Sequence, residues 1–414
     1  MTKLEAEMAE EINWIETRGR VKQFIEDVVY PLEEGFDKDT AESQAALKVV
    51  QQKAKDAGLW ALGHPKDIGG QGMPFMDYVH VNEVIGRSHL GSVAVGSNTL
   101  QDSIMLRLYA SPEWRKNYME PLVAGEFYQS FAMTEPEVAS SDPTALVTEA
   151  VLDGNHWVIN GHKWFTSGAD RARYTTVMVK TEPDAPSHEA FSMIIVPTDN
   201  PGYNIQRDIR AMGMLGGHME VKYENCRVPA TNMLGERGEG FKVAQERLGP
   251  GRIFHAMRWL GQAQRAFDIM CERLNSRKIR GEMLGDKQLM QAFVFESAAE
   301  IQQSRLMTLD AARKMDAGDQ ARVEISLIKV TGARMLHNVI DRAIQVLGAK
   351  GVTDDTPLEK MYRQARFARL VDGADEVHIY RTGRRILRAF ERGEGYDFGE
   401  REGQMSHQSR RAES

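Results

Sequence analysis

Two short segments of the sequence gather hydroxyl-bearing and aromatic side chains of the kind that hold a planar ring. The first spans residues 131–142 and reads FAMTEPEVASSD, and the second spans residues 160–169 and reads NGHKWFTSGA. Thr134 and Thr166 offer hydroxyl groups, and Trp164 offers a flat face. A heteroaromatic ring with carbonyl and nitrogen acceptors needs such groups around it. The residues alone are equally typical of a Ser/Thr-rich turn and a strand with a core tryptophan.

A third segment, near the C-terminal end, carries a candidate general base. Asp372 precedes a glycine, and Asp375 and Glu376 follow it closely. A carboxylate within reach of a substrate C–H bond can accept its proton. An Asp-Gly pair is also a common turn, and Asp375 would suit the N-cap of a following helix. On these residues alone the turn is the stronger interpretation.

The bulk composition limits the classes of protein. The 414 residues suffice for two or three domains, and the formal charge of −7 comes from 52 basic and 59 acidic residues. A nucleic-acid-binding protein usually shows a basic excess instead. The two cysteines, Cys226 and Cys271, suit a reducing compartment, and we expect no metal site. We see no signal peptide and no apolar run of the roughly 18 residues that span a membrane, so we expect a cytoplasmic protein without stable membrane insertion.

The periodicity of apolar residues changes twice along the chain. It predicts an α+β multidomain fold with an N-terminal helical domain, a central β-barrel-like or sandwich domain and a C-terminal four-helix bundle. Asp-Gly and Asn-Gly pairs separate short apolar runs in the centre, which is typical of hairpins. The predicted domains are residues 1–128, 129–237 and 238–393, followed by a polar tail over 394–414. The long helices are expected over 241–274, 287–315, 321–347 and 375–392.

With these motifs in this order, residues 20 to 392 resemble the acyl-CoA dehydrogenase superfamily. The segments at 131–142 and 160–169 are similar to its flavin-binding signature. Residues 133–142, 247–252 and 372–378 resemble the branch that in animals is fused to a kinase-like (aminoglycoside phosphotransferase) domain. The extra residue between Thr-Glu-Pro and Ser-Asp is typical of that branch. A chain of 414 residues has room for the dehydrogenase part only.

The resemblance implies FAD as the cofactor and a set of residues around it. Trp164 would offer its face to the ring and Thr166 a hydroxyl to its N5 atom, while Phe165, where Ile is more usual, would point away. Arg280 and Ala374 replace a Phe and a Thr of the usual pattern, which weakens two contacts. The residues expected to bind FAD are Phe131, Met133, Thr134, Ser140, Ser141, Trp164, Thr166, Ser167, Arg277, Gln288, Gln345, Gly348, Ala349, Asp375 and Glu376.

The resemblance also makes Asp372 the catalytic base. Most members carry a Glu at this position, and Asp is shorter by one methylene, about 1.5 Å, so the substrate must lie slightly closer. Some branches place the base just before an Arg in the first bundle helix, but here that position is Gly251, which has no side chain. The residues expected to contact the acyl-CoA are Ser141, Gly249, Arg252 and Gly373.

The implied function is α,β-dehydrogenation of an acyl-CoA thioester to a trans-2-enoyl-CoA in fatty acid β-oxidation. Electrons would pass to an electron-transfer flavoprotein, and shared FAD sites imply a homodimer or homotetramer. Small and polar residues over 91–100 would admit a bulky, branched or hydroxylated acyl chain. The resemblance to the kinase-fused branch further implies a long, branched, 4-hydroxy or 4-phospho acyl chain. Three alternatives stay open: a flavin oxidase of the same fold, similar to nitroalkane oxidase, a non-catalytic acyl-CoA or flavin-binding protein, and a helical scaffold without cofactor.

Overall fold

The structure is a computed structural model that describes residues 13–36, 40–214 and 217–399. The chain divides into two compact units, each built from discontinuous segments. We call them the bundle unit, within residues 1–30, 74–91 and 249–414, and the sheet unit, within residues 31–73 and 92–248. Among the described helices, none combines the length and the apolar character that crossing a membrane requires.

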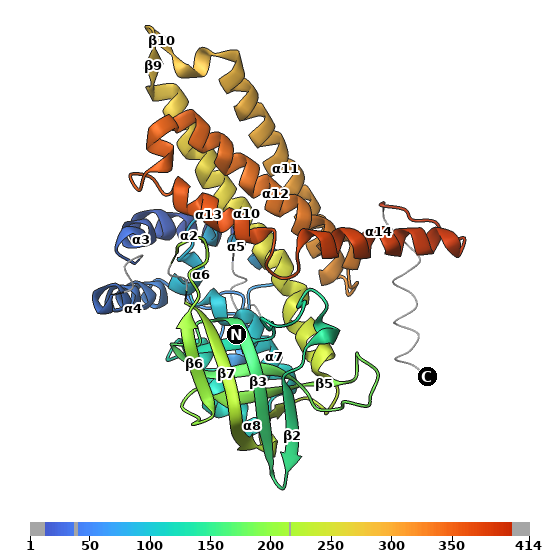
Figure 1. The fold of residues 1–414 in the computed structure, drawn as a ribbon. Helices are drawn as coiled ribbons and strands as arrows, with labels where there is room; N and C mark the ends of the chain where they lie inside the picture. The colour runs from blue at the N-terminus through green and yellow to red at the C-terminus, as the bar shows by residue number, and fades with distance from the viewer. Residues whose placement is uncertain (1–12, 37–39, 215–216, 400–414) are drawn as a thin grey trace, which may run out of the picture. The chain divides into compact units, whose positions relative to one another are not determined.

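The sheet unit contains one mixed sheet of eight strands (Figure 1). Seven strands follow the order β6-β7-β3-β2-β4-β5-β8, and β1 pairs in parallel with β4. The predicted Asp-Gly turn connects β2 to β3, with Gly154 at φ +60°, where a residue without Cβ is favoured. The strands are β1 Tyr128–Ala132, β2 Glu149–Asp153, β3 His156–Ser167, β4 Ala172–Lys180, β5 Phe191–Pro197, β6 Tyr203–Asp208, β7 His218–Pro229 and β8 Met233–Leu234.

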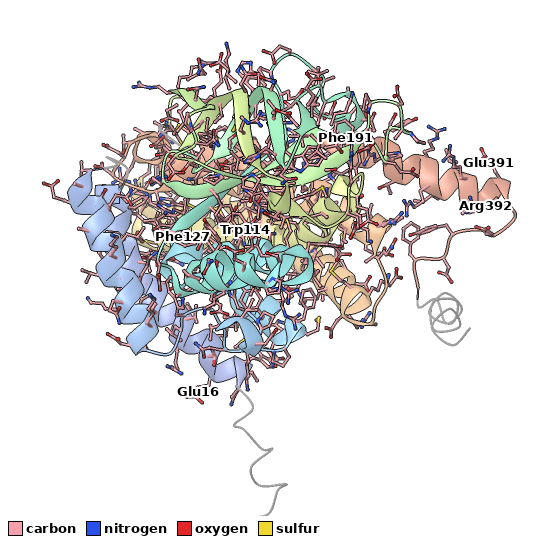
Figure 2. The ribbon with its side chains drawn as sticks, turned by 90° about the horizontal axis from the view of Figure 1, so that it is seen from below. Glu16, Trp114, Phe127, Phe191, Glu391 and Arg392 are labelled. Carbon is pink, nitrogen blue, oxygen red and sulfur yellow. The ribbon has the colours of Figure 1, made fainter. Side chains whose placement is uncertain are left out.

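Helices of the same unit pack on this sheet through aromatic side chains. Tyr174 of β4 is fully buried, and its ring lies 5.9 Å from that of Trp114 and 6.2 Å from that of Phe127 (Figure 2). Phe191 of β5 belongs to the same core cluster. Burial of such large rings contributes strongly to the stability of the unit. The helical elements are α3 Tyr30–Phe36, α4 Ala41–Asp56, η2 Lys66–Ile68, α6 Gly91–Ala94, η3 Ser97–Thr99, α7 Leu100–Tyr109, α8 Pro112–Trp114, η4 Arg115–Met119, α9 Glu120–Ala124, η5 Pro143–Ala145 and η6 Ala230–Asn232.

The bundle unit is helical, as the sequence predicts. Helix α12 packs against α11, α13 and α14, and Figure 1 shows α11 and α12 running alongside one another. The four long helices begin and end within two residues of the predicted bounds, so these predictions are confirmed. The elements are α2 Trp14–Phe24, η1 Ile25–Val29, α5 Phe75–Ile85, α10 Gly240–Ser276, β9 Lys278–Ile279, β10 Glu282–Met283, η7 Leu284–Asp286, α11 Gln288–Asp316, α12 Arg322–Leu347, η8 Gly348–Val352, α13 Leu358–Ala368 and α14 Asp375–Glu391.

Some elements were not predicted from the sequence. Residues 91–100 contain the short helix α6 and the 3-10 turn η3, with Gly96 between them at φ +71°, where an added Cβ would lie 2.5 Å from the Trp60 ring. Strands β9 and β10 form a small hairpin whose turn residues, Arg280 and Gly281, both have positive φ. Helix α13 was not predicted. The domain boundaries at 128, 237 and 393 stay predictions, and residues 1–12 and 400–414 lie outside the described part of the chain.

Candidate functional site

The candidate base lies on a tight turn of the bundle unit between α13 and α14. Asp372 has φ +54° and Gly373 has φ +101°. Asp is one of the few residues with a side chain that enter the left-handed region readily. A Cβ on Gly373 would lie only 2.8 Å from Nε2 of His378, so this position requires glycine. The turn therefore explains the Asp-Gly pair, and it also exposes the Asp372 carboxylate, whose side chain keeps 27% of its accessible surface.

Two side chains hold the backbone of this turn. Nε and Nη2 of Arg252 each lie 3.4 Å from the carbonyl oxygen of Asp372, and Nε2 of His378 lies 3.1 Å from the same atom. Burial lowers the pKa of His378 to about 4, so its imidazole is neutral near pH 7. Its other nitrogen lies 3.2 Å from the Ser326 hydroxyl. The predicted contact residue Arg252 thus lies directly beside the predicted base.

A third side chain approaches the carboxylate of Asp372 itself. Nε2 of His255 lies 3.3 Å from Oδ2 of Asp372, and Nη2 of Arg258 lies 3.2 Å from Nδ1 of His255. Sequence reasoning missed His255, Arg258 and His378. The first two follow Arg252 at intervals of three residues on α10, which places all three on neighbouring positions of one helix surface. This spacing of three residues was the signal from which the sequence could have predicted His255 and Arg258 as site residues.

The side chain of Asp375 has a structural role. It is 1% exposed, and its carboxylate lies 3.3 Å from Nζ of Lys329 and 3.0 Å from Nε of Arg369. These ion pairs connect the start of α14 to α12 and to the end of α13, and Ala374 rather than Asp375 is the N-cap. A cofactor contact at this position would therefore fall to the backbone or to Glu376, which is exposed.

In the sheet unit, a buried ion pair joins the two segments that carry the ring-binding residues. Lys163 and Glu135 are both fully buried, and Nζ of Lys163 donates to Oε1 of Glu135 at 2.8 Å and to the carbonyl of Met133 at 2.8 Å. The Glu135 carboxylate also accepts the backbone amides of Val147 and Thr148. This network holds the 133–142 loop against β3.

Direct hydrogen bonds complete the connection. The hydroxyl of Thr134 donates to the carbonyl of Trp164 at 2.9 Å, and the amide of Trp164 donates to the carbonyl of Thr134 at 3.1 Å. The Ser140 hydroxyl accepts from the amide of Glu135 and donates to its carbonyl, so it shapes the loop, whereas Ser141 is exposed. The structure therefore brings the two predicted segments into contact.

A bulge near the end of β3 sets the directions of Phe165, Thr166 and Ser167. A bulge in the β3–β7 pairing between Lys163 and Thr166 places Phe165 at φ +50° and leaves it 42% exposed. Thr166 is fully buried, and its hydroxyl has no hydrogen-bond partner among the described residues. Ser167 is exposed, with its hydroxyl 2.7 Å from Nδ1 of His218. Phe165 and Ser167 are therefore accessible at this end, while the hydroxyl of Thr166 faces the interior without a partner among the described residues. The cofactor roles of Thr166 and Ser167 stay predictions.

Phe131, another aromatic residue of the predicted FAD-binding set, packs against the guanidinium group of an arginine. The guanidinium of Arg247 lies 4.3 Å from the centre of the Phe131 ring, and Nε of Arg247 donates to Asp102 at 2.5 Å. Asp102 is buried, so this ion pair is shielded from water. The contact fixes the orientation of Phe131 near the start of the loop.

The remaining predicted residues lie at helix ends of the bundle unit. Arg277 precedes β9 and Gln288 begins α11, while Gln345 lies near the end of α12 and Gly348 and Ala349 begin η8. All five are exposed. Their binding roles stay predictions, as does that of Gly249 in α10.

Comparison with known proteins agrees with this architecture. Three family models match in order: the acyl-CoA dehydrogenase N-terminal domain over 15–126, the middle domain over 130–226 and the C-terminal domain over 238–387. The chain is 39% identical over 392 residues to "Probable acyl-CoA dehydrogenase FadE2" of Mycobacterium tuberculosis, covering 90% of this chain and 95% of that protein. A solved candidate acyl-CoA dehydrogenase from Mycobacterium abscessus has a TM-score of 0.86 at 34% identity, covering 92% of this chain and 100% of that one.

A second relative covers the chain but is much longer. "Acyl-CoA dehydrogenase family member 11" of Gallus gallus is 37% identical over 380 residues, which is 87% of this chain and 48% of that protein. This chain therefore spans about half the length of that relative. Taken together, the matches show that the chain belongs to the acyl-CoA dehydrogenase family, which makes it an FAD-dependent oxidoreductase.

Proposed function

We propose that the protein oxidises an acyl-CoA thioester between its α and β carbons and releases a trans-2-enoyl-CoA, with Asp372 as the base. The observation that carries this proposal is the Asp372 turn. A carboxylate on a left-handed residue, with its backbone held by Arg252 and His378 and its side chain partly exposed, is arranged for chemistry rather than for packing. Arg252 and His378, which hold the backbone of Asp372, belong to the same bundle unit as Asp372.

FAD, when bound, would supply the acceptor for the two electrons that leave the substrate. In the sheet unit, Thr134, Trp164, Thr166 and Ser167 are the groups that we propose to hold its ring. The exposed hydroxyl of Ser167 and the buried hydroxyl of Thr166, which has no hydrogen-bond partner among the described residues, support this assignment. Ser141, exposed on the loop, is the proposed contact to the cofactor or the thioester.

The residues of the bundle unit would act on the substrate. Asp372 accepts the α-proton on a carboxylate oxygen, and the backbone amide of Asp372 donates to the thioester carbonyl. That hydrogen bond stabilises the negative charge that develops on the oxygen as the proton leaves. Arg252 keeps the turn in place through its two contacts to the Asp372 carbonyl. The guanidinium remains a cation, although burial lowers its pKa.

The acyl chain is proposed to be long, branched or oxygenated at carbon 4. Support comes from the small and polar residues of 91–100 and from the similarity to the longer relatives. Gly96 lies close to the Trp60 ring, and helix α6 ends at Ala94. A panel of straight, branched and 4-oxygenated thioesters tests this point, and equal turnover of all of them would contradict it.

An electron-transfer flavoprotein is the proposed electron acceptor, and the protein is proposed to form a homodimer or homotetramer. Exposed apolar side chains on α11 support association, since Leu289 and Phe295 are each 74% exposed. Arg277 and Gln288, at the adjoining end, are proposed to contact FAD of a neighbouring subunit. Sedimentation of the purified protein measures the oligomeric state.

The first experiment is an anaerobic titration of the purified flavoprotein with acyl-CoAs, followed by the visible absorbance of the oxidised flavin. We expect one class of thioester to bleach the flavin, and we expect D372N to bind the same thioester but to bleach at least a hundredfold more slowly, on the order of the loss of a general base. Bleaching at the same rate in D372N would exclude Asp372 as the base. Oxygen consumption and peroxide formation without CoA would indicate the flavin oxidase instead.

A further inference from the structure

We infer that His255 is a positioning residue for the catalytic base. Together with Arg258 it forms a chain of hydrogen-bond donors that ends on the carboxylate of Asp372 and holds that carboxylate in one orientation and in its ionised form. This inference rests on the proposed function, because it assumes that Asp372 accepts the substrate proton.

The direction of the hydrogen bonds follows from the chemistry of arginine. A guanidinium has only donors, so Nδ1 of His255, 3.2 Å from Nη2 of Arg258, must act as the acceptor. The proton of a neutral His255 then lies on Nε2. This is the nitrogen 3.3 Å from Oδ2 of Asp372, so the proton of a neutral His255 faces the carboxylate.

The position of Arg258 is set by close helix packing within the bundle unit. A Cβ on Gly86 would lie 2.2 Å from Cα of Arg258, and a Cβ on Gly261 would lie 2.0 Å from the carbonyl oxygen of Glu83. The end of α5 and α10 therefore approach closely at Arg258 and again at Gly261, about one helical turn further along α10. Such contact leaves the backbone of α10 little freedom, so the donor that faces His255 is preorganised.

The backbone and the carboxylate of Asp372 are held by separate groups. Arg252 and His378 contact the carbonyl oxygen of Asp372 and so constrain its backbone. His255 contacts the carboxylate oxygen Oδ2 and so constrains the rotation of the side chain. A catalytic base displaced by about 1 Å can lose on the order of a hundredfold in rate, so a residue that fixes the carboxylate affects turnover without touching the substrate.

The charged and titratable groups around this pair come from several elements. Those on α10 are Arg252 and Arg258, and those on other elements are Tyr78 of α5, Lys329 of α12, and Asp375, His378 and Arg381 of α14. Most of the groups that carry a charge are cations, and their field favours the ionised carboxylate in every variant. The change produced by a substitution at His255 therefore isolates the donated hydrogen bond.

The geometry also argues against His255 as a second proton acceptor. A protonated imidazole needs a proton on Nδ1 as well, and that nitrogen faces the Arg258 guanidinium. Two cationic donors would then face each other at 3.2 Å. His255 is therefore a donor throughout, which distinguishes it from a relay.

The test compares two replacements of His255 in the holoenzyme. In H255Q the side-chain amide can still donate to Asp372, and in H255L it cannot. Infrared difference titration follows the carboxyl band of Asp372, which is assigned by its absence in D372N. In H255L we expect the titration midpoint of this carboxyl to rise by about one pH unit, and kcat/KM below the midpoint to fall about tenfold. In H255Q we expect most of both effects to be reversed.

Two further variants serve as controls. H337Q removes a histidine of α12 whose ring contacts Tyr362, and it should leave the midpoint unchanged. H255N has an amide too short to reach Asp372, so it repeats the loss of the donor if H255L does not fold. An unchanged titration midpoint of the Asp372 carboxyl in folded H255L or H255N would overturn the inference. An equal fall of kcat/KM in H255Q and H255L would also overturn it, because that result is expected of a proton relay. Because the infrared titration needs no turnover, a shifted midpoint without acyl-CoA activity would support His255 while refuting the proposed function.

Discussion

Replacing Lys163 by methionine should destabilise the protein more than any other single substitution discussed here. Nζ of Lys163 and the Glu135 carboxylate have no solvent exposure, and Lys163 also donates to the carbonyl of Met133. K163M therefore leaves a buried carboxylate with only the two amides of Val147 and Thr148, together with a carbonyl that has lost a donor. Methionine fills nearly the same volume, so the change in packing is small.

The magnitude follows from the loss of a charge inside the unit. Breaking a buried ion pair from one side costs about 3–5 kcal/mol, and the lost donor to the Met133 carbonyl adds about 1 kcal/mol. We expect K163M to lower the free energy of unfolding by about 4–6 kcal/mol. E135Q should cost less, because burial already lowers the pKa of Lys163 to about 8 and an unpaired Lys163 can release its proton.

The assay is urea unfolding, followed by circular dichroism and by release of the flavin. The double variant E135Q/K163M should be less destabilised than the sum of the single variants, because each single change alone leaves an unpaired charge. The control is R227M, which removes the exposed ion pair between Arg227 and Asp153 in the same sheet and should cost less than about 1 kcal/mol. A cost below 1 kcal/mol for K163M, or strict additivity in the double variant, would refute the reasoning.

Three other substitutions test separate parts of the structure. Burial lowers the pKa of His378 from 6.5 to about 4, so between pH 6.5 and pH 4 the unfolded chain binds a proton that the folded chain does not. When urea unfolding is compared at pH 7.5 and pH 5, the parent should therefore lose about 2 kcal/mol more stability than H378N. G373A should cost about 1–3 kcal/mol and reduce the rate of flavin bleaching, and an unchanged rate would show that the turn tolerates a Cβ. F295E should yield a smaller species in sedimentation, whereas V151E, at a position of β2 that is 60% exposed, should not.

Much of the fold follows from local patterns. The four long helices were predicted within two residues because their apolar positions repeat at helical spacing over more than four turns. The β2–β3 hairpin was predicted because Asp153 and Gly154 suit its turn. Helix α13 was missed: it has eleven residues and lies between two glycine- and aspartate-rich segments, which read as loop.

The sequence by itself determined the family, the candidate base and the pairing of the two ring-binding segments, because these depend on residue types at short spacing. Only the tertiary structure decided which groups surround them. Asp372 gains Arg252 and His255 of α10 as neighbours through tertiary packing, although both lie more than a hundred residues before it in the chain. The bulge in β3 exposes Phe165 and buries Thr166. Strict alternation of faces along a strand cannot reveal these directions, because one inserted residue turns each later side chain to the opposite face.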